Sequence, residues 1–286
     1  MTLAWRAARA ESIDQLRAAG IDDPEGEVRW IIERACGRTP AEQASALDEL
    51  VTEREAGFLR EMVRRRSAGE PLQYVLGRWG FRTLDLLVDR RVLIPRPETE
   101  VVADHAIRSA QAVGGDAVVV DLGTGSGAIA LSVAAECWPH VEVWATDVSA
   151  EALAVARANL AGLGRRAASV RLLEGDWFAA LPADLRGRVD VVVSNPPYVA
   201  ADDPLPGEVA DWEPPGALVA GPSGLEAVEQ IVAEAPAWLA KGGTLVVEVG
   251  DTQGTAAAAL AAAAGFAEVD VVPDLTGRDR VLVARR

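Results

Sequence analysis

Val118-Val119-Val120-Asp121-Leu122-Gly123-Thr124-Gly125-Ser126-Gly127 is the stretch that decides the fold. An apolar run followed by three alternating glycines is typical of a buried strand that turns sharply into a helix. In sheets built from alternating strands and helices, ligands bind at the ends of such strands. A turn with nothing bound to it has little need of three glycines. We therefore expect the loop residues Gly123, Thr124, Gly125, Ser126 and Gly127 to hold a ligand.

Outward from this stretch, strands and helices alternate from about residue 115 to the end of the chain. Strands are expected at 118–122, 141–146, 170–173, 189–194, 244–249, 267–272 and 279–284. Helices are expected at 128–136, 150–160, 225–239 and 255–264. Such alternation predicts an α/β fold with a mostly parallel sheet covered on both faces. No helix separates the last two strands, so we expect them to form an antiparallel pair at one edge.

The chain before this sheet divides into two parts. Residues 1–70 read as a bundle of helices, in which Ser12 is expected to cap a helix start while Gly20 and Gly37 end helices. Residues 71–97 are predicted to form a β-hairpin linker, with strands at 74–77 and 81–88. A third segment, 98–286, carries the sheet, and its first helix is expected to start at Thr99 with acidic residues in the first turn.

A second informative stretch, Asn195-Pro196-Pro197-Tyr198, directly follows the apolar run 189–194. The two prolines end the strand and hold the local backbone stiffly. The Asn195 side chain and the Pro196 carbonyl can then be aimed at one point beyond the strand end. Two convergent acceptors suit a planar NH2 group, and Tyr198 can supply a flat wall beside it. A plain Asn-Pro turn is the alternative that the tetrapeptide alone leaves open.

Acidic and aromatic residues follow the next strands along the chain. Asp147 ends the strand after the glycine loop, where an acid would hold ribose hydroxyls. This arrangement fits a nicotinamide cofactor and S-adenosylmethionine equally, because both carry an adenosine ribose. The negative charge of Asp121 opposes a pyrophosphate and favours the cofactor with an amino group and a sulfonium. Asp176 and Trp177 could bracket the adenine, although Trp177 could equally pack against the sheet.

Composition narrows the classes of partner. The 286-residue chain has a formal net charge of −15, and Lys241 is its only lysine, so we expect no direct nucleic-acid partner. Cys36 and Cys137 are too few for a disulfide framework, and no histidine pair has metal-ligand spacing, so no metal is expected. We find no convincing signal peptide and no apolar stretch that would span a bilayer. These observations favour a cytoplasmic protein, expected to be a monomer, with no membrane partner.

Taken together, the motifs resemble the family of peptide chain release factor glutamine N5-methyltransferases, which are class I S-adenosylmethionine-dependent methyltransferases. The resemblance covers the chain closely from about Gly69 to the end and weakly before it. The segments that carry it are 69–74, 93–100, 121–130, 175–178, 194–198, 213–214, 217–218 and 274–281. Two departures are Trp212, where the family usually has a smaller aromatic residue, and the loop 200–208, which is rich in Asp and Pro.

The resemblance implies a Rossmann-like, seven-stranded methyltransferase sheet with a small helical N-terminal domain for substrate recognition. It implies methyl transfer from S-adenosylmethionine to the glutamine amide of the Gly-Gly-Gln motif in class 1 release factors. Asn195, Pro196 and Tyr198 would be catalytic, and Pro197 would join them in binding the glutamine. The implied cofactor-binding residues are Gly123, Thr124, Gly125, Ser126, Gly127, Asp147, Asp176, Trp177 and Asn195.

Three alternatives stay open at this point. Adenine-N6 methyltransferases carry the same tetrapeptide pattern, but such enzymes usually have a basic surface or an added recognition module. A ribosomal-protein glutamine methyltransferase would share every motif. A dinucleotide-dependent oxidoreductase would explain the glycine loop and Asp147, but it would leave 195–198 without a role.

Overall fold

The chain divides into two compact units in the computed structural model, which describes residues 3–286. The first unit comprises Met1–Arg78 together with Gly207–Trp212, and the second comprises Trp79–Pro206 together with Glu213–Arg286. The segment 71–97, expected as one linker, is therefore divided at Arg78. The short helix α9 (Gly207–Trp212) belongs to the first unit although its sequence lies within the second.

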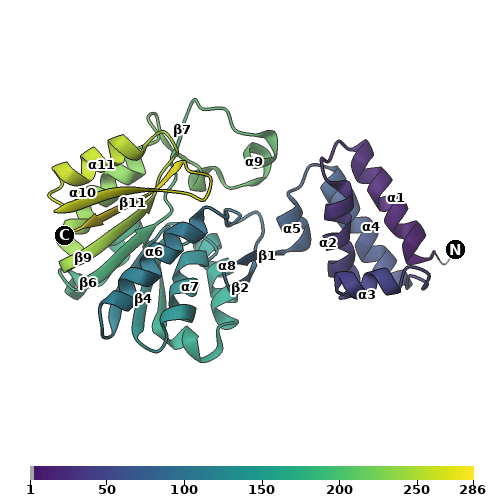
Figure 1. Ribbon diagram of the computed structural model, residues 1–286, viewed down its shortest axis with the longest axis horizontal. Coiled ribbons are helices and arrows are strands. Elements are labelled where there is room, and N and C mark those ends of the chain that lie inside the picture. Colours follow the sequence, from purple (N-terminus) through teal and green to yellow (C-terminus); the bar gives the residue numbers. More distant parts are fainter. Residues whose placement is uncertain (1–2) are drawn as a thin grey trace. The chain divides into compact units, whose positions relative to one another are not determined.

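The first unit is helical, as the sequence predicted for residues 1–70 (Figure 1). Besides α9 it contains α1 (Trp5–Ala18), α2 (Pro24–Cys36), α3 (Pro40–Ser45), α4 (Glu53–Ser67) and α5 (Leu72–Leu76). The expected cap at Ser12 is wrong. Ser12 lies buried inside α1, where its hydroxyl donates to the Ala8 carbonyl at 2.8 Å. The helix starts earlier because Trp5 opens its buried face. Gly37 ends α2 in the left-handed conformation, as expected.

The predicted strand at 74–77 is also wrong, because residues Leu72–Leu76 form helix α5. A short apolar run fits a buried strand and a buried helical turn equally well, so periodicity could not distinguish them. Arginine side chains complete the hydrogen bonding of this turn: Arg65 donates to the Tyr74 carbonyl and Arg34 to the Leu76 carbonyl, each at 2.9 Å. The hairpin follows directly, with β1 (Arg78–Phe81) and β2 (Leu84–Leu87). The run 81–88, expected as a single strand, is therefore divided by the turn of this hairpin at residues 82–83.

The second unit is built on a seven-stranded sheet with the order β10-β11-β9-β6-β3-β4-β5. Its strands are β3 (Ala117–Leu122), β4 (Val141–Asp147), β5 (Val170–Glu174), β6 (Val189–Ser194), β9 (Leu239–Glu248), β10 (Glu268–Pro273) and β11 (Asp279–Arg285). Strand β11 is antiparallel to both of its neighbours, whereas the pairs among β5, β4, β3, β6 and β9 are parallel. The expected α/β sheet with an antiparallel edge is confirmed.

Helices cover both faces of this sheet, as Figure 1 shows. On one face lie α6 (Thr99–Ala112), α7 (Ala128–Cys137) and α8 (Ala150–Ala161), and on the other α10 (Glu226–Trp238) and α11 (Gly254–Ala263). The core under α10 and α11 takes every second strand residue, such as Val120, Val192 and Leu245, as the pleat requires. Within residues 3–286 no helix is long and apolar enough to cross a membrane.

Shorter strands and helices lie between these longer elements along the chain. Strands β7 (Val199–Ala200) and β8 (Val219–Gly221) form a small separate sheet. The 3-10 helices are η1 (Gly164–Ser169), η2 (Trp177–Ala180), η3 (Ala183–Leu185) and η4 (Pro215–Ala217).

The order of the strands in the seven-stranded sheet determines where a ligand can bind. From β3 the chain continues to β4 on one side, while β6 lies on the other, and crevices form where the strand order reverses in this way.

Candidate active site

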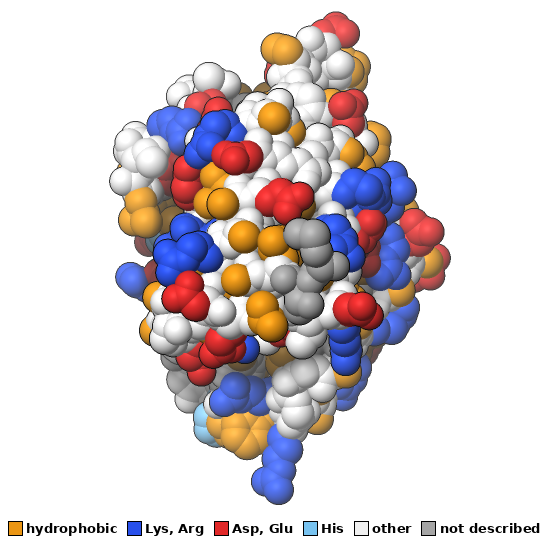
Figure 2. Space-filling model, turned by 90° about the vertical axis from the view of Figure 1, so that its right-hand side faces the viewer, with side chains coloured by type: hydrophobic (Ala, Val, Ile, Leu, Met, Phe, Trp, Pro, Cys, Tyr) orange, Lys and Arg blue, Asp and Glu red, His pale blue; other side chains and the backbone are white. Residues whose placement is uncertain are grey.

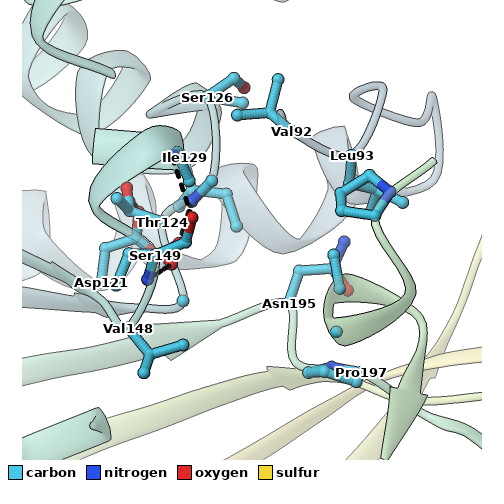
Figure 3. A pocket seen from close by; sticks show the side chains of 18 of the residues that line it. Val92, Leu93, Asp121, Thr124, Ser126, Ile129, Val148, Ser149, Asn195 and Pro197 are labelled. Carbon is cyan, nitrogen blue, oxygen red and sulfur yellow. Dashed lines mark hydrogen bonds between the residues drawn. The ribbon is translucent and has the colours of Figure 1, made fainter. Parts of the chain in front are cut away.

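A cavity of about 380 Å³ lies at the carboxyl ends of β3, β4 and β6 (Figure 3). Strand register explains why distant motifs meet here. Leu122 pairs with Ser194 on one side and with Thr146 on the other, so the residues that follow these three start from the same edge. Of the residues predicted from sequence, those that line the cavity are Gly123, Thr124, Gly125, Ser126, Asp147, Asp176, Trp177, Asn195 and Pro197.

Three predicted residues are not among those lining the cavity: Gly127, Pro196 and Tyr198. Gly127 is the N-cap of α7 and has a φ of 85°. A Cβ there would lie 2.9 Å from Leu131 Cδ1, so glycine is needed for packing rather than for contact with the ligand. Pro196 is buried. Burial raises the pKa of Tyr198 to about 12, and the negative charge of Glu248 adds to the rise.

The glycine loop is held tightly against β4. The backbone N–H groups of Gly123 and Thr124 both donate to the Thr146 carbonyl at 2.9 Å. Gly123 has a φ of 70°, and a Cβ at this position would lie 3.2 Å from Cζ3 of Trp177. The indole of Trp177 therefore lies on the loop and also packs against the core of the sheet. Packing against the sheet is therefore confirmed for Trp177, and the indole also lines the cavity, whereas its expected contact with an adenine stays a prediction.

Asp121 is almost completely buried, with 1% exposure, beneath this loop. Its Oδ2 accepts hydrogen bonds from Thr124 Oγ1 at 2.6 Å and from the Ala130 N–H at 3.1 Å. Its Oδ1 has no hydrogen-bond partner among the described residues. Burial raises the pKa of Asp121 to about 7, and the charge of Asp147 adds to the rise, while the two hydrogen bonds oppose it. A buried acceptor without a partner at the cavity fits a ligand that brings an ammonium group.

Asp147 is held by two backbone donors. Gly125 N–H donates to Oδ2 at 2.8 Å and Ser149 N–H donates to Oδ1 at 2.9 Å. Burial raises the pKa of Asp147, and these two hydrogen bonds counteract the rise. Each oxygen still has a lone pair, so the carboxylate could accept ribose hydroxyls while the backbone fixes its orientation. The residues present therefore fit a cofactor that carries an adenosine ribose and an amino group.

Asn195 lies across the cavity from Asp121 and Thr124, as Figure 3 shows. Its Nδ2 donates to Thr99 Oγ1 at 3.1 Å, and Thr99 Oγ1 in turn donates to Glu248 Oε2 at 2.7 Å. Thr99 starts α6, as the sequence predicted, and it also lines the cavity. The side of the cavity expected to hold an amine is thus connected to a buried carboxyl group on β9.

Sequence reasoning assigned no role to Glu248, Thr99 or Glu213 at this site. Glu213 has only 4% exposure, and its Oε2 accepts the Ile94 N–H at 3.1 Å while Oε1 accepts from the Arg96 guanidinium. It thereby connects the segment 93–97 to Pro214, and both line the cavity. A signal for Glu248 did exist in the sequence, because it is an acid at the carboxyl end of an apolar strand. Within residues 3–286 no cluster of three or more His, Cys, Asp or Glu side chains could hold a metal ion.

Comparison with known proteins identifies the class to which this fold and site belong. The Methyltransferase small domain family matches residues 107–205, and the PrmC N-terminal domain family matches residues 7–77. The crystal structure of a methyltransferase from Pyrococcus furiosus has a similar fold, with a TM-score of 0.52 and 21% identity over 71% of this chain and 89% of that one. Fold and site thus define a methyltransferase.

Relatives along the whole chain identify the family. A release factor glutamine methyltransferase from Cereibacter sphaeroides is 42% identical over 98% of this chain and 98% of its own length. One from Moorella thermoacetica is 41% identical over 100% of this chain and 99% of its own. The chain belongs to the release factor glutamine methyltransferase family, which confirms the resemblance noted in the sequence.

Proposed function

We propose that this protein transfers a methyl group from S-adenosylmethionine to the side-chain amide nitrogen of the glutamine in the Gly-Gly-Gln motif of class 1 release factors, in the cytoplasm. The observation that carries the proposal is the position of Asn195 on the cavity that also contains Asp121 and Asp147. Bound S-adenosylmethionine supplies an electrophilic methyl group. Asp147 would hold its ribose hydroxyls, and Asp121 Oδ1 would accept from its amino group.

The protein's part in the reaction is to hold a poor nucleophile in place. An amide nitrogen is weakly nucleophilic because its lone pair is delocalised into the carbonyl group. Asn195 Oδ1 on the cavity wall would accept one of its N–H bonds. The carbonyl of Pro196, which directly follows Asn195 although Pro196 does not itself line the cavity, would accept the other and so fix the nitrogen. Positioning of this kind is worth several kcal/mol. The same acceptors stabilise the positive charge that grows on the nitrogen during transfer. No strong base is needed, because the proton can leave to water afterwards.

Charge favours a protein substrate over a nucleic acid. The two acceptors of 195–196 would suit the amine of adenine as well as a glutamine amide. The formal net charge, however, is −15, and Figure 2 shows acidic and basic side chains interspersed on the face it displays. Phosphate backbones bind surfaces on which lysine and arginine gather. A nicotinamide-dependent reaction would leave Asn195 without a role.

The decisive experiment is to incubate the protein with methyl-labelled S-adenosylmethionine and a class 1 release factor, then locate the methyl group by mass spectrometry. We expect one methyl group on the glutamine of Gly-Gly-Gln. A release factor with that glutamine changed to glutamate is the matched control and should remain unlabelled. Label on a ribosomal protein, RNA or DNA, with none on the release factor, would overturn the proposal.

A further inference from the structure

A chain of hydrogen bonds runs from the cavity into the core of the sheet unit. Asn195 Nδ2 donates to Thr99 Oγ1 at 3.1 Å, and Thr99 Oγ1 donates to Glu248 Oε2 at 2.7 Å. The three connected elements are α6, β9 and the turn after β6. Thr99 and Glu248 are 4% and 1% exposed, so water cannot easily replace either hydrogen bond.

The direction of each hydrogen bond in this chain follows from the number of protons. An ionised carboxylate can only accept, so the single hydroxyl proton of Thr99 must point to Glu248. Thr99 Oγ1 is then left with lone pairs alone on the side of Asn195. Only the NH2 end of the Asn195 amide can donate to them. The other end of the same amide, Oδ1, is thereby turned away from Thr99 and is available as an acceptor.

We propose that Glu248, acting through Thr99, is the positioning residue that determines which way round the Asn195 amide lies, and so presents Oδ1 to the substrate. The inference deepens the proposed function, because it assigns Asn195 Oδ1 the task of accepting an N–H bond of the target amide. Neither Glu248 nor Thr99 takes part in bond making. Their effect is to exclude the orientation in which Asn195 would present its own NH2 group to the NH2 group of the substrate.

The groups around Glu248 decide when it is ionised. Burial raises the pKa of Glu248 to about 7, and Glu98 before α6 adds to the rise. Thr99 on α6, Arg280 on β11 and the Tyr198 hydroxyl all oppose it. Protonated Glu248 could donate its proton to Thr99, whose own proton would then turn to Asn195. The amide would be stable the other way round, with its NH2 group facing the substrate. Activity should therefore fall as Glu248 takes up its proton.

Two isosteric changes test this chain of hydrogen bonds by kinetics. Thr99→Val removes the hydroxyl, and Glu248→Gln removes the obligate acceptor; each should lower kcat for release factor methylation about 10- to 100-fold, with the Kd of S-adenosylmethionine changed less than about 3-fold. Thr99→Ser keeps the hydroxyl and should restore kcat to near the wild-type value. Thr244→Val, a buried position on the same strand β9 outside this chain of hydrogen bonds, is the matched control.

Two further kinetic results separate positioning from a purely structural role. The wild-type kcat should fall as the pH drops through about 7, whereas the kcat of Thr99→Val should not change with pH in this range. The double variant that combines Thr99→Val with Glu248→Gln should have a kcat no lower than that of Thr99→Val alone, because both changes break the same chain of hydrogen bonds. Wild-type kcat in folded Thr99→Val, or additive losses in the double variant, would overturn the proposal.

A spectroscopic measurement keeps the inference testable even if no release factor is methylated. Asn159 and Asn195 are the only asparagines in the sequence, so selective 15N labelling gives just two side-chain amide signals. The Asn195 signal should shift as the pH crosses about 7 and should lose this shift in Thr99→Val. Asn159, which donates to the Ser126 and Leu87 carbonyls, is the internal control and should not respond. An Asn195 signal insensitive to both changes would refute the inference, whereas failure of methylation alone would refute only the proposed function.

Discussion

Asn195 and Asp147 line the same cavity, yet they are expected to fail in different ways when truncated. Asn195→Ala removes the acceptor for the target amide, so kcat should fall at least about 100-fold, while the Kd of S-adenosylmethionine stays within about 3-fold. Asp147→Ala removes the acceptor for the ribose, so that Kd should rise about 10- to 100-fold. Calorimetric binding and steady-state kinetics separate the two, with surface variant Gln230→Ala as the control. A near-normal kcat in Asn195→Ala would contradict the mechanism.

Asp121 gives a prediction about the pH dependence of stability. Its pKa is raised from an ordinary 3.8 to about 7, so the folded protein keeps a proton that the unfolded chain loses between these values. Unfolding therefore releases protons in this window, and the free energy of unfolding falls as the pH rises through it. Asp121→Asn removes this contribution. Between pH 5 and pH 8 the free energy of unfolding of the variant should therefore fall by about 2.5 kcal/mol less than that of the wild type.

Urea denaturation at a series of pH values measures this difference. Asp184→Asn, at an exposed carboxylate, is the control and should follow the wild-type curve. The pKa of Glu248 is also raised to about 7, so Asp121→Asn should keep part of the pH dependence of the free energy of unfolding. Equal slopes in wild type and Asp121→Asn would show that Asp121 is ionised in the folded protein well below pH 7.

Gly123 tests how closely the loop and Trp177 must approach. Gly123→Ala introduces a Cβ 3.2 Å from Trp177 Cζ3 at a φ of 70°, so the indole must shift on the cavity wall. We expect a loss of stability of about 1–2 kcal/mol and about 10-fold weaker binding of S-adenosylmethionine. Gly114→Ala is the matched control, because its φ is 74° and its Cβ would meet open space. It should show the backbone strain without the change in affinity.

At the scale of elements, Glu213 connects the segment 93–97 to the turn that starts at Pro214. Glu213→Gln keeps the shape but removes the charge that faces Arg96. We expect a loss of roughly 1–3 kcal/mol in the free energy of unfolding, and a higher KM, because both connected segments line the cavity. Chemical denaturation and kinetics measure the two effects, with exposed Glu229→Gln as the control. An unchanged KM would mean that this connection does not shape the cavity.

The elements also show what could be predicted from the sequence. Strand β6 was expected at 189–194 and lies there, because a long apolar run between turn residues has one stable placement. Helix α5 was mistaken for a strand because four buried side chains in five residues carry no usable period. Asp147 was recognisable since its place relative to the glycine loop is local. The role of Glu248 was not, because its partner Thr99 lies 149 positions away and only the fold brings them together.

For the whole molecule, the net charge of −15 is the property with measurable consequences. Repulsion among excess negative charges opposes the compact state, and salt screens it. We expect Tm to rise by a few degrees when ionic strength increases from about 0.01 M to about 0.2 M. A neutral osmolyte at equal osmolarity is the control for solvent effects. A Tm that falls over this range would show that favourable ion pairs outweigh the repulsion.

The place of β11 in the sheet has a consequence for how the protein is made. The last strand of the chain lies between β9 and β10, so it pairs with both. While the chain is still being synthesised, β9 has an open edge and β10 lacks the strand that joins it to the sheet. Because synthesis runs from the N-terminus and β11 follows both of its partners in the sequence, this sheet can close only after β11 has emerged from the ribosome.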